Sequence, residues 1–218
     1  MALEHALRVR KPANALVQNE INISIIFNYL RQHGSSYRAQ ISRDLNISAP
    51  AVSRAIDKLT ELKYVVESEP MRTASGKKAV KVSINVARGF VLGLDILKEN
   101  VRIAAFDYRG SMIAAGQGIH ISASTDVPAD LIREIETFLD GMSTHTRAEL
   151  KAICVGVPAV VEAETARLTS AILCPNLAGI NFKHILTERF RVPVYVENDV
   201  HLSALAENQF GVVSCQVV

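Results

Sequence analysis

The pattern of apolar and polar residues changes along the chain, from helical spacing near the start to strand-like runs after about residue 90. Between residues 16 and 33, apolar side chains recur every three or four positions, which predicts an amphipathic helix that Gly34 ends. We expect one side of this helix to face the core, and that side holds Ile21, Ile25, Ile26, Tyr29 and Leu30.

Two shorter helical patterns follow, joined by a short connection. In the first, Ile41 and Leu45 are one turn apart and share a face. Asn46 can adopt the left-handed conformation that a tight exit needs, and Ser48 is a good N-cap for the next helix. The second helix has an apolar stripe made of Val52, Ile56, Leu59 and Leu62. Together they predict a helix-turn-helix.

The second helix carries the chemistry expected of a recognition helix. Such a helix enters the major groove of DNA with its N-terminal end toward the bases. Small residues at that end permit close approach, and Arg54 can donate paired hydrogen bonds to guanine or to phosphate. A helical hairpin that only packs against the core would explain the same stripe. The candidate DNA contacts in this part are Arg38, Ser48, Ala49, Ala51, Ser53, Arg54 and Lys58.

A predicted β-hairpin comes next. Residues 64–69 form one expected strand, and residues 80–84 alternate apolar with polar side chains, as a half-buried strand does. Three helices followed by such a hairpin predict a winged helix-turn-helix. The polar tip suits contact with phosphate or the minor groove, although a plain hairpin with solvated lysines has the same composition. Its candidate contacts are Arg72, Gly76, Lys77 and Lys78.

Beyond a junction at residues 85–89, the pattern is that of a mixed α/β domain. Three apolar runs joined by tight turns predict an antiparallel meander, at residues 90–96, 101–108 and 111–119. Helices and strands then alternate: helix 126–145, strand 152–157, helix 181–190, strand 192–197 and helix 200–210. We therefore expect an α+β protein with two domains, 1–88 and 89–218.

The distribution of charge supports a polyanion as the partner of the first domain. Residues 1–90 contain 14 Lys and Arg against 7 Asp and Glu, whereas residues 91–218 contain 10 against 15. The net charge of +2 is therefore the sum of a basic N-terminal part and an acidic C-terminal part. Apolar residues make up 49% of the chain, enough for a real core.

The cysteines, the histidines and the hydropathy of the chain bear on metal binding and on the cellular compartment. Cys154, Cys174 and Cys215 are far apart, and neither they nor the histidines have the spacing of a metal site. No secretory signal and no apolar run of membrane-spanning length are apparent, so we expect a reduced, cytoplasmic setting without membrane contact.

Several short stretches resemble the ROK family (repressor, open reading frame, kinase), and in particular its transcriptional repressors for xylose and N-acetylglucosamine. The helix-turn-helix is one of them, and the most specific is Val-Glu-Asn-Asp at residues 196–199, which continues into Ala-Leu-Ala-Glu at 204–207. The others lie at residues 75–78, 91–95, 155–158 and 175–177.

The resemblance implies an actin-like (ribonuclease H-like) sugar-kinase fold behind the winged helix-turn-helix, with only its first lobe in this chain. The second lobe and the zinc-binding cysteine cluster of the family would lie beyond Val218, so we expect no cofactor here and a fragment or a truncated gene product. In kinases of the family, the strand that ends at Asp95 leads into a glycine and a threonine beside the ATP phosphates. Leu97 and Asn100 occupy those places here, and a leucine blocks close approach.

The resemblance also implies a sugar site. Asn198 and Asp199 match a pair that binds sugar hydroxyls in the family, and Asn176 matches another sugar-contacting asparagine. Judged without the resemblance, Asp199 is more simply the N-cap of the following helix, and Asn176 a loop residue. The pair does follow the carboxyl end of a strand, however, where open α/β sheets place ligands, and amide and carboxylate groups suit a polyol.

These observations predict a sugar-responsive repressor of carbohydrate metabolism genes that binds operator DNA as a dimer. The main alternative is a sugar kinase with an added DNA-binding domain, against which Leu97 argues. A third possibility is a DNA binder that does not respond to any effector.

Overall fold

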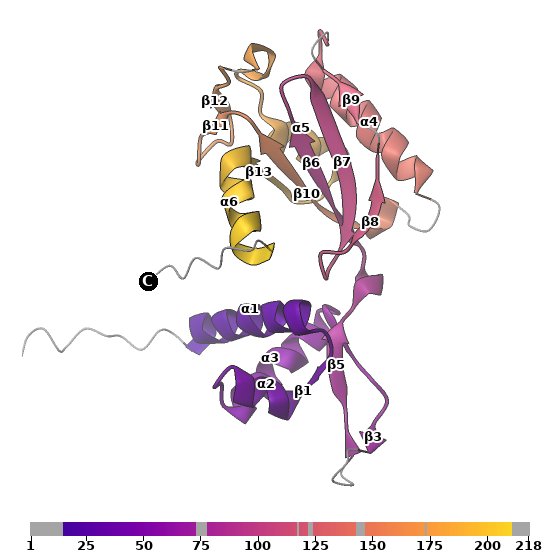
Figure 1. Ribbon diagram of the computed structural model, residues 1–218, viewed down its shortest axis with the longest axis vertical. Helices are drawn as coiled ribbons and strands as arrows, with labels where there is room; N and C mark the ends of the chain where they lie inside the picture. The colour runs from indigo at the N-terminus through magenta and orange to yellow at the C-terminus, as the bar shows by residue number, and fades with distance from the viewer. Residues whose placement is uncertain are drawn as a thin grey trace, which may run out of the picture. The chain divides into compact units, whose positions relative to one another are not determined.

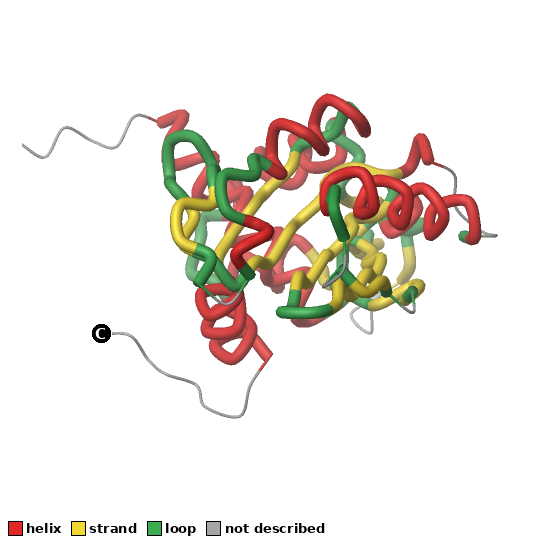
Figure 2. Tube along the Cα trace, turned by 90° about the horizontal axis from the view of Figure 1, so that it is seen from above, coloured by secondary structure: helices red, strands yellow, loops and turns green. Residues whose placement is uncertain are grey.

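The computed structural model describes residues 15–72, 78–116, 118–121, 124–142, 147–172 and 174–210. It is a mixed α+β structure (Figure 1; Figure 2). The chain divides into two compact units, Met1–Arg88 and Gly89–Val218, which we call unit 1 and unit 2. Within the described ranges, no helix is long and apolar enough to cross a membrane.

Unit 1 begins with three helices, α1 (Ala15–His33), α2 (Arg38–Asp44) and α3 (Ala49–Glu61). The connection between α2 and α3 is tight because Asn46 is left-handed, at φ 52°, as predicted. The apolar stripes of the helices meet in a core that includes Ile26, Leu30, Ile41, Val52, Ile56 and Leu59. Leu62 follows the end of α3 and is 42% exposed, so the predicted stripe stops one turn early.

The prediction for α1 was wrong for two of its five core residues. Ile21 and Ile25 are 44% and 41% exposed, whereas Ile26 and Leu30 are buried. The buried side runs through Asn22, Ile26 and Leu30, which are spaced by four residues. Because each residue turns an α-helix by about 100°, Ile25 is turned by about 100° from Ile26, whereas Tyr29, three residues after Ile26, is turned by only about 60° and remains on the buried side.

Two small antiparallel sheets complete unit 1. In the first, β5 (Lys81–Ile84) lies between β1 (Ser36–Tyr37) and β2 (Val65–Glu67). The second is a ribbon of β3 (Met71–Arg72) and β4 (Lys78–Ala79). The predicted hairpin is therefore present, with strands shorter than the sequence pattern indicated. A 3-10 turn, η1 (Val86–Arg88), ends the unit.

Unit 2 is built on a mixed sheet with the strand order β13-β10-β6-β7-β8, and β9 also pairs with β7. The first strands form the antiparallel meander that the sequence predicted, while β10 runs parallel to both β6 and β13. The strands are β6 (Phe90–Ile96), β7 (Asn100–Asp107), β8 (Met112–Ala115), β9 (Ile119–His120), β10 (Leu150–Val157) and β13 (Val194–Asn198).

The third strand of the meander is interrupted, where one continuous strand was expected. β8 ends at Ala115 and β9 begins at Ile119, with Gly118 between them at φ 77°. A Cβ at Gly118 would lie 2.0 Å from the carbonyl oxygen of Val101, so only glycine lets the backbone pass β7 this closely. The interruption is therefore a consequence of close packing between the two chain segments.

Helices lie on both faces of this sheet. One face packs its alternate apolar residues against α4 (Val127–Gly141) and α5 (Phe182–Phe190), and α6 (Asp199–Phe210) lies against Gly156 on the other face. α4 ends at Gly141, before the predicted end at residue 145, because Met142 adopts an extended conformation; residues 143–145 of that prediction lie outside the described residues. Smaller elements are β11 (Val160–Val161), β12 (Leu168–Ser170), η2 (Arg147–Glu149) and η3 (Pro175–Leu177).

Candidate functional site

The N-terminal end of α3 is open to solvent, as a recognition helix requires. Ser48 and Ala49 are exposed, and Ala51 and Ser53 are half-buried. The carbonyl oxygen of Ser48 accepts hydrogen bonds from the backbone N–H of Ala51 at 2.9 Å and of Val52 at 3.0 Å, but its hydroxyl makes no capping hydrogen bond. The hydroxyl of Ser48 is therefore available to an external partner.

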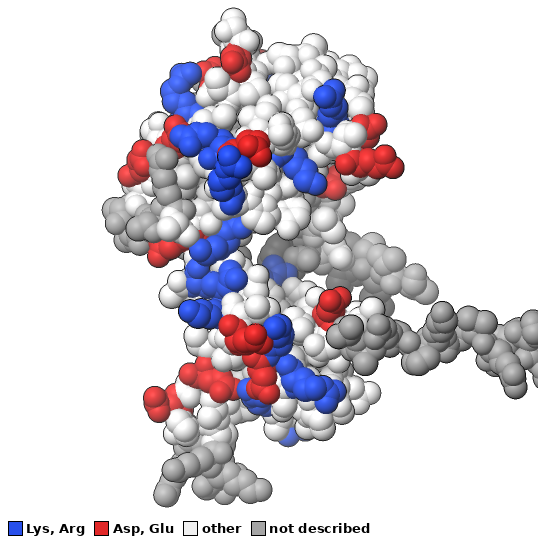
Figure 3. All heavy atoms as spheres, turned by 180° about the vertical axis from the view of Figure 1, so that it is seen from behind, with Lys and Arg blue, Asp and Glu red and all other residues white. Residues whose placement is uncertain are grey.

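The two basic residues of α3 differ in their surroundings. Lys58 forms an ion pair with Glu61, with 2.9 Å between Nζ and Oε2. Arg54 is exposed, and no carboxylate of the described residues forms an ion pair with it. Figure 3 shows that Lys and Arg side chains lie beside Asp and Glu on the visible face of each unit, rather than in a single basic patch. Arg54 is thus the basic group of α3 that is best placed for a new contact.

Arg38, at the start of α2, is held by two carboxylates. Its Nη2 lies 2.7 Å from both Asp57 Oδ1 and Glu67 Oε1, and its Nε donates to the same Glu67 oxygen at 3.1 Å. Nη1 donates to the carbonyl oxygen of Ser53 at 3.2 Å. Burial lowers the pKa of Arg38, but the hydrogen bonds from its guanidinium to Glu67 and Asp57 outweigh that effect and raise the pKa overall.

The ribbon of unit 1 carries two of the predicted wing residues. Arg72 in β3 and Lys78 in β4 are directly opposed across the strand pair. Gly76 and Lys77 lie outside the described residues. The sequence prediction for this ribbon therefore remains a prediction, with two of its four positions located on paired strands.

In unit 2, the strand register brings two of the predicted sugar-site residues, Asn198 and Asp199, to the edge of the sheet that is formed by the carboxyl ends of its parallel strands. Gly156 of β10 pairs with Asp95 of β6 on one side and with Glu197 of β13 on the other. Val157 pairs with Asn198, the last residue of β13, and Asp199 begins α6. Because these strands are parallel, their carboxyl ends meet, which is where open α/β sheets place ligands.

Asn198 and Asp199 have different roles at that edge. The side-chain oxygen of Asn198 accepts from the backbone N–H of Val200 at 2.9 Å and of His201 at 3.3 Å, and its Nδ2 donates to the carbonyl oxygen of Ala159 at 3.0 Å. Asn198, and not Asp199, is therefore the N-cap of α6. The Asp199 carboxylate accepts from the N–H of Val200 at 2.9 Å through one oxygen, Oδ1.

A groove of about 900 Å³ lies beside this edge, between the sheet and α6. Asp199 lines it together with Asp95, whose carboxylate lies 3.7 Å from Nε of Arg102, its cross-strand partner. Leu97 lines the same groove, and its N–H donates to the carbonyl oxygen of Asn100 at 2.7 Å, which closes the hairpin. The groove therefore combines charged groups at one end with apolar walls.

Asn176 and Cys154 differ in their relation to the groove. Asn176, in η3, is exposed and does not line the groove; its Nδ2 donates to the carbonyl oxygen of Ile121 at 3.4 Å. Cys154 does line it, and burial together with the nearby Glu197 raises the pKa of its thiol. Within the described ranges, no group of three or more His, Cys, Asp or Glu residues could hold a metal ion.

Two polar pairs at this site were missed by the sequence reasoning. Oε1 of Glu197 accepts from the N–H of Asn198 at 2.7 Å and lies 3.1 Å from Nδ1 of His201. The first of these hydrogen bonds, and then His201, lower the pKa of Glu197. The second pair, Asp95 and Arg102, could have been found from opposite charges placed symmetrically about a predicted hairpin turn.

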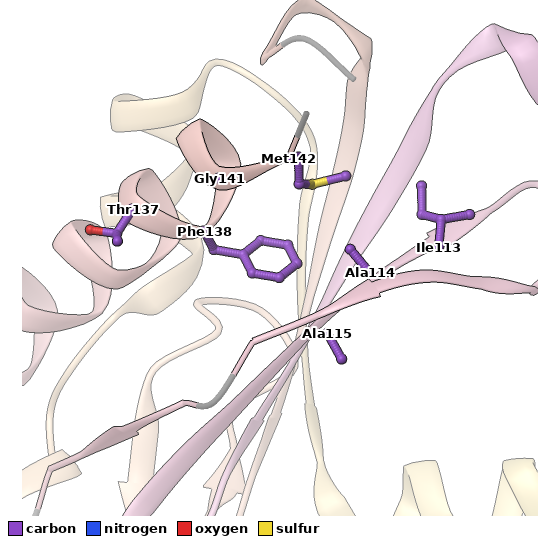
Figure 4. Close-up of a pocket in the computed structure, with 7 residues that line it drawn as sticks. All are labelled: Ile113, Ala114, Ala115, Thr137, Phe138, Gly141 and Met142. Carbon is purple, nitrogen blue, oxygen red and sulfur yellow. The ribbon is translucent and has the colours of Figure 1, made fainter. Parts of the chain in front are cut away.

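A second hollow in unit 2, of about 330 Å³, lies between β8 and α4 (Figure 4). The side chains that line it are mainly apolar, with Phe138 and Met142 on the helix side and Ile113 on the strand side. The hydroxyl of Thr137 is already bonded to the carbonyl oxygen of Arg133 at 2.9 Å. Without convergent polar side chains, this hollow does not suit a polyol.

Comparisons with known proteins agree with this description. Residues 91–216 match the ROK family. The chain is 24% identical to the xylose repressor of Caldicellulosiruptor bescii over 201 residues, which are 91% of this chain and 50% of that protein. It is 23% identical over 202 residues to the DNA-binding transcriptional dual regulator NagC of Escherichia coli K12, covering 91% and 48%. The chain thus spans about half the length of these curated relatives.

A solved structure extends the similarity to the fold. It is the crystal structure of a ROK family transcriptional regulator described as a homolog of the E. coli MLC protein. It superposes with a TM-score of 0.70 and 21% sequence identity, covering 88% of this chain and 48% of that one. Because the family match includes more than half of the chain, we conclude that the chain belongs to the ROK family.

Proposed function

We propose that this chain is the DNA-binding part and the first sugar-binding lobe of a sugar-responsive transcriptional repressor of carbohydrate metabolism genes. The observation that carries the proposal is the open N-terminal end of α3, with small residues and with an Arg54 that forms no ion pair among the described residues. The chain is also similar over 91% of its length to a protein named as a xylose repressor and to one named as a DNA-binding transcriptional dual regulator. The protein acts on operator DNA in the cytoplasm, as a dimer on a palindromic site.

Unit 1 is the DNA-binding domain, a winged helix-turn-helix. α2 and α3 form the helix-turn-helix, and α3 enters the major groove with Ser48, Ala49 and Ala51 toward the bases. Arg54 contacts guanine or phosphate, and the β3–β4 ribbon is the wing that meets phosphate or the minor groove. What supports this arrangement is the order of the elements and the exposure of α3.

Unit 2 is the first lobe of an actin-like, sugar-binding domain. In support, three antiparallel strands precede two parallel ones, in the order β13-β10-β6-β7-β8, and helices cover both faces. A sugar binds at the edge where Asp199 faces the groove, and Asn198 holds Asp199 in place by capping α6. Asn176, on η3, does not line this groove, so its contact with a sugar remains a prediction from the resemblance. Sugar binding shifts the population of states that bind DNA.

The chain is a regulator and not a sugar kinase. Phosphoryl transfer requires backbone N–H groups and a metal ion around the nucleotide phosphates. Leu97 lines the groove at the hairpin that follows Asp95. The resemblance to kinases of the family places the ATP phosphates beside this position, where a leucine side chain disfavours their close approach. The alternative, a sugar kinase with an added DNA-binding domain, predicts ATP-dependent phosphorylation of a sugar by the purified protein.

The test is a DNA-binding titration of the 218-residue chain. A labelled duplex of random sequence and duplexes selected by the chain from a random pool are titrated at several salt concentrations. We expect binding that weakens steeply with salt, because each phosphate contact releases counterions. Arg54→Ala should lower the affinity for the selected duplexes more than for the random one. Absence of binding even at low salt would contradict the proposal.

A further inference from the structure

The two arginines beside the proposed recognition surface have opposite environments. Arg54 is exposed and unpaired among the described residues, whereas Arg38 makes four hydrogen bonds inside unit 1. A guanidinium has five N–H donors. Since four of them are engaged by Glu67, Asp57 and the carbonyl oxygen of Ser53, Arg38 has little capacity left for a phosphate or a base edge.

The charge around Arg38 also disfavours contact with DNA. The cluster contains one positive and two negative charges, with both carboxylates 2.7 Å from Nη2. An approaching phosphate would therefore meet a cluster of net negative charge. By contrast, removing Arg38 would leave Asp57 and Glu67 as two uncompensated carboxylates next to a surface that is proposed to bind a polyanion.

Arg38 and its partners belong to three different elements. Arg38 begins α2, Ser53 and Asp57 lie on α3, and Glu67 is the last residue of β2. A forked, planar guanidinium holds its partners in a fixed geometry, which a flexible ammonium does not. This arrangement joins the proposed recognition helix to the sheet from which the ribbon extends.

On these grounds we infer that Arg38 is a positioning residue of the proposed DNA-binding domain: it holds α3 against β2 and neutralises Asp57 and Glu67, and it does not itself contact DNA. The inference rests on the proposed function and separates Arg38 from the other basic residues that the sequence predicted as DNA contacts. Arg54 is therefore the proposed DNA contact, and Arg38 keeps the helix that carries Arg54 in position.

A double-mutant cycle tests this role in the 218-residue chain. Arg38→Met is made alone and together with Asp57→Asn and Glu67→Gln, and Arg54→Met is the matched control in both backgrounds. Affinity is measured for a labelled random duplex and for duplexes selected by the unmodified chain. The measurements are made over a range of salt, at a temperature where every variant is folded by circular dichroism.

We expect Arg38→Met alone to weaken binding by about tenfold at low salt, within the range for coupled neighbours, and by less at high salt, because salt screens the repulsion between the two carboxylates and DNA. In the background without the two carboxylates, Arg38→Met should have almost no effect. Arg54→Met should weaken binding in both backgrounds and either change the sequence preference or reduce the salt slope by about 0.9, the value for one phosphate contact.

The inference would be overturned if Arg38→Met weakened binding more in the background without the two carboxylates than in the unmodified chain. If Arg38 contacts DNA, removal of the carboxylates frees its guanidinium, and Arg38→Met then costs more in that background than in the unmodified chain. A decrease of the salt slope by Arg38→Met in the background without the two carboxylates would also contradict a positioning role, because only a direct phosphate contact would then be lost. If the unmodified chain binds neither duplex at low salt, the proposed function itself fails, which is distinguishable from a failure of the Arg38 cycle.

Discussion

The candidate sites of the two units are assembled in different ways. In unit 1, the residues proposed to meet DNA in the major groove lie on one helix, between Ser48 and Lys58. In unit 2, the candidate sugar site joins the ends of strands that are distant in sequence, with Asp95 on β6, Gly156 on β10 and Asp199 after β13. A site on a single helix depends on local structure, whereas a site at a sheet edge depends on register.

The two sites also differ in the interactions that hold their polar side chains. In unit 1, Lys58 and Arg38 form ion pairs with carboxylates, whereas Arg54 forms none among the described residues and can bind an external partner. In unit 2, the side chain of Asn198 is held by hydrogen bonds from backbone N–H groups of α6, whereas Asp199 faces the groove. The comparison predicts that damage to unit 1 and damage to unit 2 can be produced separately.

The largest expected effect is the loss of unit 1 alone. Ile56→Ala removes a fully buried side chain of α3 and should lower the free energy of unfolding of unit 1 by about 2–5 kcal/mol. The exposed Ile21→Ala is the matched control, with an expected change within about 0.5 kcal/mol. Urea unfolding followed by circular dichroism measures both. Equal losses for the two variants would show that the burial pattern of α1 and α3 is not as described.

A second variant should disturb unit 2 alone. A Cβ at Gly156 would lie 3.1 Å from Cδ1 of Leu202 on α6, so Gly156→Ala should force the Leu202 side chain to shift by a few tenths of an ångström and cost about 1–3 kcal/mol. Gly141→Ala, where a Cβ meets nothing within 4 Å, is the control and should be neutral or slightly stabilising. Unfolding monitored in both variants tests this. A destabilised Gly141→Ala protein with an unaffected Gly156→Ala protein would reverse the assignment.

A third variant examines a polar link within unit 1. The Tyr29 hydroxyl donates to Oδ2 of Asp44 at 2.6 Å, so Tyr29→Phe should cost about 1.5–3 kcal/mol, as for a hydrogen bond to a charged group. This hydrogen bond raises the pKa of Tyr29. Since the pKa is higher in the folded state, the contribution is complete below about pH 10 and disappears as the pH rises through the folded-state value.

The control for this link is Tyr195→Phe in unit 2, because Tyr195 is 63% exposed. That substitution should leave the free energy of unfolding nearly unchanged at every pH. Unfolding curves at neutral pH and above pH 10 compare the two variants. If the difference between the Tyr29→Phe protein and the unmodified chain persists undiminished at the higher pH, the hydrogen bond to Asp44 is not its source.

The smallest effect is expected at Glu197. The N–H of Asn198, and then His201, lower its pKa, so its contribution is present above the ordinary carboxyl pKa and is lost as the pH falls through the folded-state value. Because the pair is largely exposed, Glu197→Gln should cost no more than about 1 kcal/mol. Titration of the Glu197 carboxyl by NMR in the unmodified chain and in a His201→Gln variant measures the link. An unchanged Glu197 pKa in the variant would remove the pair from the description.

Local features of the chain were predictable from its sequence. The apolar stripe fixed α3, and the conformation of Asn46 followed from the need for a tight exit. The meander of β6 and β7 followed from alternating runs around a turn, and its register then places Asp95 opposite Arg102. In each case the interacting residues are close in sequence, so their relation can be counted directly.

Interactions between distant residues were not predictable in the same way. The ion pair of Arg38 with Glu67 depends on where β2 pairs with β5, and a shift by one residue would turn Glu67 to the other face. The exposure of Ile21 and Ile25 depends on which side of a broadly apolar helix meets α3. The capping role of Asn198 depends on a carbonyl group in the connection after β10.

The central position of β5 has a consequence for how unit 1 unfolds. β5 pairs with β1, which directly precedes α2, and with β2, which follows α3, so it closes two loops of the chain at once. Releasing β5 frees the edges of both neighbours, and the helices and the hairpin should therefore unfold in one cooperative transition. The amide hydrogen of Val82, in the middle of that strand, should then exchange with solvent only when the whole unit opens.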